Sequence, residues 1–91
     1  MFVKVDEIVF FVYCYFLRTF YGFSVEEVIE ICSLQIPKKR LLYLLKKWEK
    51  KGFYNYGVSI DMGWFEPEYM PERYRQIIDI KRPVSEFYYN R

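Results

Sequence analysis

Residues 24–52 read "SVEEVIEICSLQIPKKRLLYLLKKWEKKG" and carry the local signals that decide the fold. "SVEE" has the form of a capping box, in which the Ser24 hydroxyl accepts a hydrogen bond from the Glu27 amide and the Glu27 carboxylate accepts one from the Ser24 amide. The apolar residues that follow share one helical face: Val25, Val28, Ile29 and Cys32. We therefore expect a short helix that begins after Ser24 and ends near Cys32.

A second helix is predicted after the break at "SLQI". Pro37 is tolerated in a first turn, and Gly52 is an expected stop. The apolar stripe has i, i+3, i+4, i+7 spacing: Leu41, Leu44, Leu45 and Trp48. The opposite surface is basic: Lys39, Tyr43, Lys46 and Lys50 in one row, with Lys38, Arg40 and Lys47 beside it. Two helices joined by a short turn, the second of them basic, form a helix-turn-helix pattern over residues 24–52.

The segment before this pattern is predicted to be a third helix. Asp6 is the expected N-cap, and the apolar run that follows continues to Phe20 and Tyr21 before Gly22 ends it. A helix that is apolar on nearly every side must be covered on nearly every side. In so short a chain a second subunit is the expected cover, which predicts a homodimer.

After Gly52 the periodicity changes. "FYNYGVSIDMGWF" is rich in aromatic and β-branched residues and predicts a β-hairpin whose turn lies between Gly57 and Gly63. A helix is expected over residues 71–82, ended by Pro83, with three residues facing inward: Tyr74, Ile77 and Ile78. The apolar tail "VSEFYYNR" is expected to dock on a partner, so the predicted homodimer uses the first helix and the C-terminal segment.

Residues 1–91 are therefore predicted to form a single domain, mainly α with a small β-hairpin (α+β), in the order helix-helix-helix-hairpin-helix. Residues 24–66 resemble the winged helix-turn-helix core of small bacterial and archaeal transcriptional regulators. The resemblance rests on the capping box, the short turn and the pattern "L..LL..W...GF", with flanking helices as in the MarR-like and PadR-like families. It implies a wing at residues 53–66 and a third helix that enters the DNA major groove through Lys38, Lys39, Leu42, Tyr43 and Lys46. Leu42 stands where those families have a small polar residue, and its expected contact is a thymine methyl.

The charge is concentrated on the third helix. The whole chain has a net charge of +2, but residues 37–52 hold seven Lys or Arg against one Glu, and residues 1–36 have a net charge of −3. A patch of one sign neutralises phosphates and gains from counterion release. Lys38, Lys39 and Arg40 support this reading most, because cations at a helix N-terminus oppose the helix dipole and favour binding of an external anion. The alternative is a lysine-rich face kept for solubility, which Lys50 and Lys51 fit best.

The wing has no basic side chain between residues 53 and 66. Wing contacts with phosphate would come from Tyr54, Asn55, Tyr56 or Ser59. We expect the wing aromatics mainly to stabilise the hairpin through cross-strand pairs, and the wing to contribute little to affinity.

The sequence contains no motif typical of a catalytic or metal-binding site. The chain has no His, no glycine-rich phosphate loop and no C-x-x-C element, so we expect no enzyme, no metal and no cofactor. The apolar run at residues 8–17 follows two acidic residues and is cut short by Arg18, which argues against a membrane helix. Cys14 and Cys32 are expected to be reduced core residues, with disulfide pairing as the alternative.

The sequence thus predicts a homodimeric, sequence-specific binder of double-stranded DNA, a transcriptional regulator of the kind that viruses and plasmids also encode. It is expected in the cytoplasm, or in the host cytoplasm if virus-encoded. The predicted DNA-binding residues are Lys38, Lys39, Arg40, Leu42, Tyr43, Lys46, Lys47, Lys50, Tyr54 and Tyr56. The alternative is a winged helix used for protein–protein assembly, whose basic helix docks an acidic partner.

Overall fold

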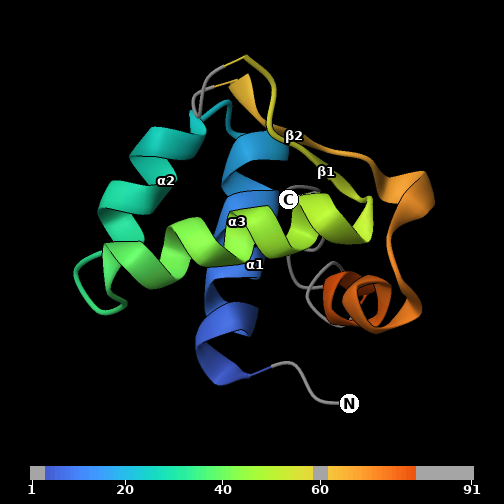
Figure 1. The fold of residues 1–91 in the computed structure, drawn as a ribbon, viewed down its shortest axis with the longest axis horizontal. Helices are drawn as coiled ribbons and strands as arrows, with labels where there is room; N and C mark the ends of the chain where they lie inside the picture. Colours follow the sequence, from blue (N-terminus) through green and yellow to red (C-terminus); the bar gives the residue numbers. More distant parts are fainter. Residues whose placement is uncertain (1–3, 59–61, 80–91) are drawn as a thin grey trace, which may run out of the picture.

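The computed structural model describes residues 4–58 and 62–79, in which three helices precede a two-stranded antiparallel hairpin and a further helix (Figure 1). The elements are α1 (Val5–Phe20), α2 (Val25–Cys32), α3 (Lys38–Lys51), β1 (Tyr54–Asn55), β2 (Trp64–Phe65), the 3-10 helix η2 (Pro67–Tyr69) and a helix at residues 72–79. Figure 1 shows α1 behind α3 and crossing it steeply, with α2 to one side and the last helix to the other. The predicted mainly helical fold and its order are confirmed.

The start of α1 differs from the prediction. Lys4, not Asp6, occupies the N-cap, and its carbonyl accepts the Ile8 amide at 2.9 Å. The Asp6 carboxylate binds Arg40 of α3 instead of capping its own helix. The face of α1 that packs inward is made of Glu7, Phe10, Phe11 and Cys14.

The two helices of the central segment form as predicted. The capping box is present: the Glu27 amide donates to Ser24 Oγ at 3.2 Å and the Ser24 amide donates to Glu27 Oε1 at 2.9 Å. At the end of α3, Gly52 has a φ of 94°, and its amide donates to the carbonyls of Trp48 and Glu49. Residues that carry a side chain rarely adopt this left-handed backbone conformation, which is why a glycine ends the helix here. The predicted apolar faces of both helices are buried.

The core is built around aromatic rings from distant parts of the chain. Trp48 of α3 is fully buried and stacks on Phe10 of α1, with 5.3 Å between ring centroids. Phe11 meets the same indole edge-on at 5.5 Å, and Phe53, just after α3, lies 6.3 Å from it. These contacts fix α3 against α1, and so decide which face of α3 points outward.

The two cysteines belong to this core. Cys14 of α1 and Cys32 of α2 are free thiols, which agrees with the interpretation as reduced core residues. Burial raises the pKa of Cys14 to about 12 and that of Cys32 to about 11. Both thiols therefore stay protonated near neutral pH and are poor nucleophiles.

The predicted hairpin is confirmed. Tyr54 lies opposite Phe65 and Asn55 opposite Trp64. Arg18 of α1 holds the second strand in place, because its Nε donates to the Gly63 carbonyl at 2.9 Å. The turn itself includes residues 59–61, which lie outside the described ranges.

The last helix packs as the sequence predicts. Tyr74 and Ile78 are buried and Ile77 is half-buried. The predicted helix end at Pro83 and the docking of the tail lie outside the described residues. Across the ranges that are described, no helix combines the length and the apolar character needed to cross a membrane.

Candidate nucleic-acid interface

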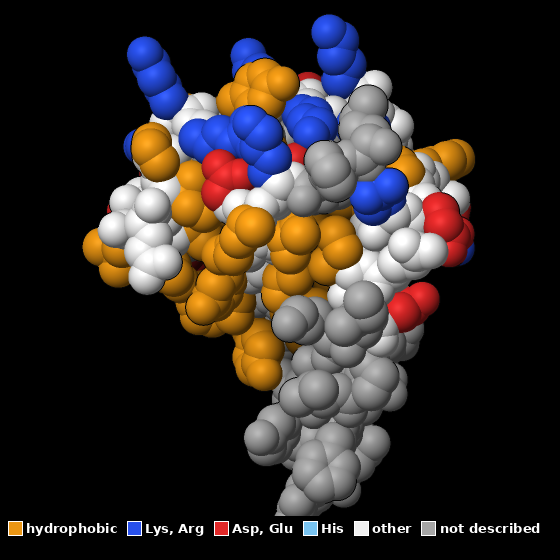
Figure 2. All heavy atoms as spheres, turned by 90° about the horizontal axis from the view of Figure 1, so that it is seen from below, with side chains coloured by type: hydrophobic (Ala, Val, Ile, Leu, Met, Phe, Trp, Pro, Cys, Tyr) orange, Lys and Arg blue, Asp and Glu red, His pale blue; other side chains and the backbone are white. Residues whose placement is uncertain are grey.

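The outer face of α3 presents the predicted basic row to solvent. We call Lys39, Tyr43, Lys46 and Lys50 the lysine row; all four are exposed, as are Lys38 and Lys51 at the ends of the helix. Figure 2 shows Lys and Arg side chains gathered along one edge of the molecule, above a hydrophobic area. The row arises because the opposite face of α3 is buried against α1 and α2.

Two of the predicted DNA contacts are already paired within the protein. Arg40 donates to the Asp6 carboxylate through Nε at 2.8 Å and Nη2 at 3.2 Å. Lys47 donates to Glu7 Oε1 at 2.8 Å. Arg40 therefore does not require an external anion, contrary to the prediction, since Asp6 supplies the anion. Lys38 and Lys39 remain exposed at the N-terminus of the helix.

Glu7 is the residue that the sequence reading missed. Its side chain is 1% exposed, and its Oε2 accepts the Trp48 indole N–H at 2.9 Å and the Tyr74 hydroxyl at 2.6 Å, while Oε1 accepts Lys47. One carboxylate thus joins α1, α3 and the last helix. A signal was present in the sequence: Glu7 shares a helical face with Phe10, Phe11 and Cys14, where a charge needs partners.

The two carboxylates of α1 remain ionised well into the acid range. Burial raises the pKa of Glu7, but the hydrogen bonds from Lys47, Tyr74 and Trp48 and the Lys47 charge together hold it below its ordinary value. The hydrogen bonds from Arg40 hold the pKa of Asp6 below its usual range. Each acid is therefore stabilised by the folded state in its charged form.

Acid is expected to destabilise the fold through Glu7. Because the pKa of Glu7 is lower in the folded chain than the unfolded value of about 4.3, its contribution is fully present above that value and is lost as the pH falls through the folded pKa. The urea midpoint of unfolding should therefore fall as the pH is lowered below about 4.3. In Glu7→Gln, which cannot titrate at this position, the fall should be shallower, with Asp6 supplying the remainder. Parallel curves for the two proteins would contradict this account.

Tyr43 is the only aromatic residue of the lysine row. It is 57% exposed, and the Arg40 guanidinium lies 5.5 Å from its ring centroid. Asp6 thus holds Arg40, and Arg40 in turn lies over one face of Tyr43. Leu42 is half-buried, so its contact with a thymine methyl would use only part of the side chain.

The tyrosines of the wing are less accessible than a contact with phosphate requires. Tyr54 is 2% exposed, and within the described residues its hydroxyl is buried with no hydrogen-bond partner. The prediction that Tyr54 contacts phosphate is wrong for this fold, because its ring packs inward against Phe65, with 5.1 Å between ring centroids. Tyr56 is half-buried and Asn55 is exposed, but the Asn55 Oδ1 accepts the Gly57 amide.

The surface that remains is almost purely cationic. With Arg40 and Lys47 paired, α3 exposes five lysines and one glutamate. A hollow of about 450 Å³ lies along this face, lined by Tyr43, Lys46, Lys47, Lys50 and Lys51. Such a surface attracts polyanions, and its lysines bind them as point charges rather than by fixed bidentate geometry.

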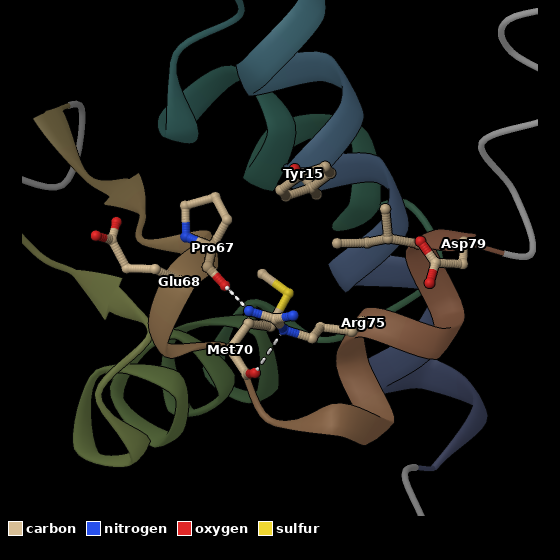
Figure 3. Close-up of a pocket in the computed structure, with 7 residues that line it drawn as sticks. Tyr15, Pro67, Glu68, Met70, Arg75 and Asp79 are labelled. Atoms are coloured by element: carbon tan, nitrogen blue, oxygen red, sulfur yellow. Dashed lines mark hydrogen bonds between the residues drawn. The ribbon is translucent and has the colours of Figure 1, made fainter.

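A separate cavity of about 370 Å³ lies beside Tyr15 of α1, between η2 and the last helix (Figure 3). Its lining is Tyr15, Pro67, Glu68, Met70, Arg75, Ile78 and Asp79. The Arg75 side chain donates to the carbonyls of Met70 at 3.1 Å and Pro67 at 3.2 Å. Arg75 therefore links η2 to the last helix. Its role in this cavity is structural, because its donors are used to hold the two segments together.

No protein-family model, curated protein or solved structure matches this chain. Its function is therefore inferred from the lysine row and from the groups that hold α3 in place.

Proposed function

We propose that the protein binds double-stranded DNA through the outer face of α3, as a winged helix-turn-helix transcriptional regulator that acts as a homodimer. The observation that carries the proposal is the lysine row: exposed cations of one sign along a helix whose other face is locked into the core. The chain order also fits, since a capped helix, a short turn, a basic helix and a hairpin follow one another. The proposal involves no catalytic step and no cofactor.

Within this proposal the residues of α3 divide into three roles. Exposed lysines neutralise phosphates, which provides affinity without reading sequence. Base discrimination falls to Tyr43 and to the exposed part of Leu42. Arg40 and Lys47 are assigned to positioning the helix, because Asp6 and Glu7 hold them.

A protein–protein assembly module is the second candidate. It is favoured by the absence of basic residues from the wing and by the hollow along α3, where Tyr43 lies among the lysines. In this case the partner would be an acidic protein surface that places an aromatic or aliphatic side chain in the hollow.

Lys39→Ala/Lys46→Ala is expected to weaken DNA binding on the order of tenfold at moderate salt and to make its salt dependence shallower by about two in the log–log slope. The measurement is fluorescence anisotropy of a labelled mixed-sequence duplex at several salt concentrations.

The matched control removes two positive charges from elsewhere on the surface, at Lys4 and Arg73, both exposed. Lys4→Ala/Arg73→Ala should leave the slope near that of the native chain. If the slope changed equally in both double variants, the loss of binding would depend on the net charge of the protein and not on the lysine row. No binding by the native chain even at low salt would exclude the DNA proposal and leave the protein–protein alternative.

A further inference from the structure

One face of α1 is apolar along the whole helix, and the described residues cover it only in part: Val12 and Phe16 are half-buried, while the other three positions are exposed. The seam consists of Val5, Val9, Val12, Phe16 and Phe20, with Tyr13 beside it, and contains no charged residue. Val5 is 77% exposed and Phe20 is 51% exposed. The residues are separated by three or four positions, which aligns them on one side of a helix in the pattern through which helices pair.

The seam continues onto the end of α2 and the turn that follows it. Ile31 and Leu34 are also exposed, and with Val9 and Tyr13 they line a groove of about 190 Å³, enough for one aromatic ring. The exposed parts of these apolar side chains amount to on the order of 600 Å² per copy, taking roughly 150–250 Å² for a whole side chain. A standard interface buries about 800 Å² per partner, so the patch supplies the apolar centre of a stable dimer.

We infer that the α1 seam is the interface of an antiparallel homodimer of this chain. The seam is graded in size, with valines in its first half and phenylalanines in its second. Antiparallel pairing places Val5 and Val9 against the partner's Phe20 and the partner's Phe16, so that small side chains meet large ones. It also aligns the two helix dipoles favourably. Parallel pairing would place the large rings against each other at one end and leave space at the other.

Antiparallel pairing also determines where the two copies of α3 lie. α3 contacts α1 through Glu7 and Phe11, on the face opposite the seam. It also contacts Asp6 and Phe10, which lie on one flank of the helix, about a quarter to a third of a turn from the seam. α3 is therefore displaced toward that flank. The two-fold axis of an antiparallel pair is perpendicular to the helices, so both copies of α3 lie on the same side of the dimer. A parallel pair would place them on opposite sides. This last consequence rests on the proposed function, because one duplex can contact both lysine rows only in the antiparallel case.

The first test is oligomeric state, measured by analytical ultracentrifugation over a concentration series, without DNA. The native chain should be dimeric, and Val9→Glu or Tyr13→Glu should raise the dissociation constant at least tenfold, on the order of an interface hot spot. Val58→Glu makes the same kind of change at a residue that is 94% exposed outside the seam, and should leave the dimer intact. Circular dichroism verifies that each variant is folded. A monomeric native chain, or a folded Val9→Glu and Tyr13→Glu pair that both dimerise normally, would overturn the interface.

The second test is orientation, measured by disulfide cross-linking under mild oxidation. Tyr13→Cys lies near the centre of the seam and should cross-link to its own copy. Val5→Cys alone should not, but should cross-link when mixed with Phe20→Cys. The native chain reports the background from Cys14 and Cys32, which are buried. Self-cross-linking of Val5→Cys would overturn the antiparallel arrangement. Because neither test contains DNA, failure of the DNA proposal would leave both results unchanged.

Discussion

Glu7→Ala is expected to lower the free energy of unfolding by about 3–5 kcal/mol, the usual cost of removing one partner from a buried ion pair. The substitution deletes the acceptor for three donors at once: the Lys47 ammonium, the Trp48 indole and the Tyr74 hydroxyl. Each buried donor that is left without a partner loses its hydration with no compensation. Urea denaturation followed by tryptophan fluorescence measures the change, because the Trp48 ring lies at the site.

Two controls separate the network from a general effect of the substitution. Glu7→Gln keeps the size and one acceptor oxygen but loses the charge that pairs with Lys47, so its loss should be smaller than that of Glu7→Ala. Glu30→Ala removes an exposed glutamate from α2 and should change stability by less than about 0.5 kcal/mol. If Glu7→Ala were no worse than Glu30→Ala, the network would not support the fold.

Gly63→Ala is expected to destabilise the fold by about 3 kcal/mol, at the upper end of the usual cost of overpacking. The backbone of Gly63 is not left-handed, so the requirement here is for space. A Cβ at this position would collide with the Tyr54 hydroxyl and come within 3.2 Å of the Asn55 carbonyl oxygen. Tyr54 is enclosed by the core and the Gly63 carbonyl is held by Arg18, so neither side can move away easily. Urea denaturation of the single variants and the double variant measures the effect.

Tyr54→Phe provides the companion measurement. Because this hydroxyl is buried without a partner among the described residues, its removal should be neutral or slightly stabilising. In the double variant it should recover part, not all, of the loss caused by Gly63→Ala, since the Tyr54 Cζ would still lie 2.6 Å from the new Cβ. Strictly additive effects would show that the two groups do not meet as described.

The elements that the sequence predicted correctly are those specified by near neighbours. The capping box joins residues three apart, the apolar faces of α2 and α3 repeat every three or four residues, and Gly52 follows the last turn that it ends. These signals act within one or two helical turns, so they can be read without knowing what the helix packs against.

The parts that sequence patterns did not reveal depend on distant partners. Asp6 looked like a cap, but it binds Arg40, 34 positions away, and Tyr54 looked like a surface residue until the hairpin turned it inward. The sequence did not show which cations of α3 are paired within the protein. The fold divides them into cations that α1 neutralises and cations that remain available to a ligand.

The hydrogen bond between Tyr74 and Glu7 also bears on when the protein can finish folding. Its two ends are separated by 67 positions, so a chain emerging from the ribosome exposes Glu7 long before its last donor has been made. Until then the α1 carboxylate has at most Lys47 and Trp48, and Phe11 and Phe53 lack the ring of Tyr74 that packs on them in the complete fold. The domain is thus expected to reach full cooperativity only after Tyr74 has been made, because this residue supplies one of the three donors that satisfy the buried Glu7 carboxylate.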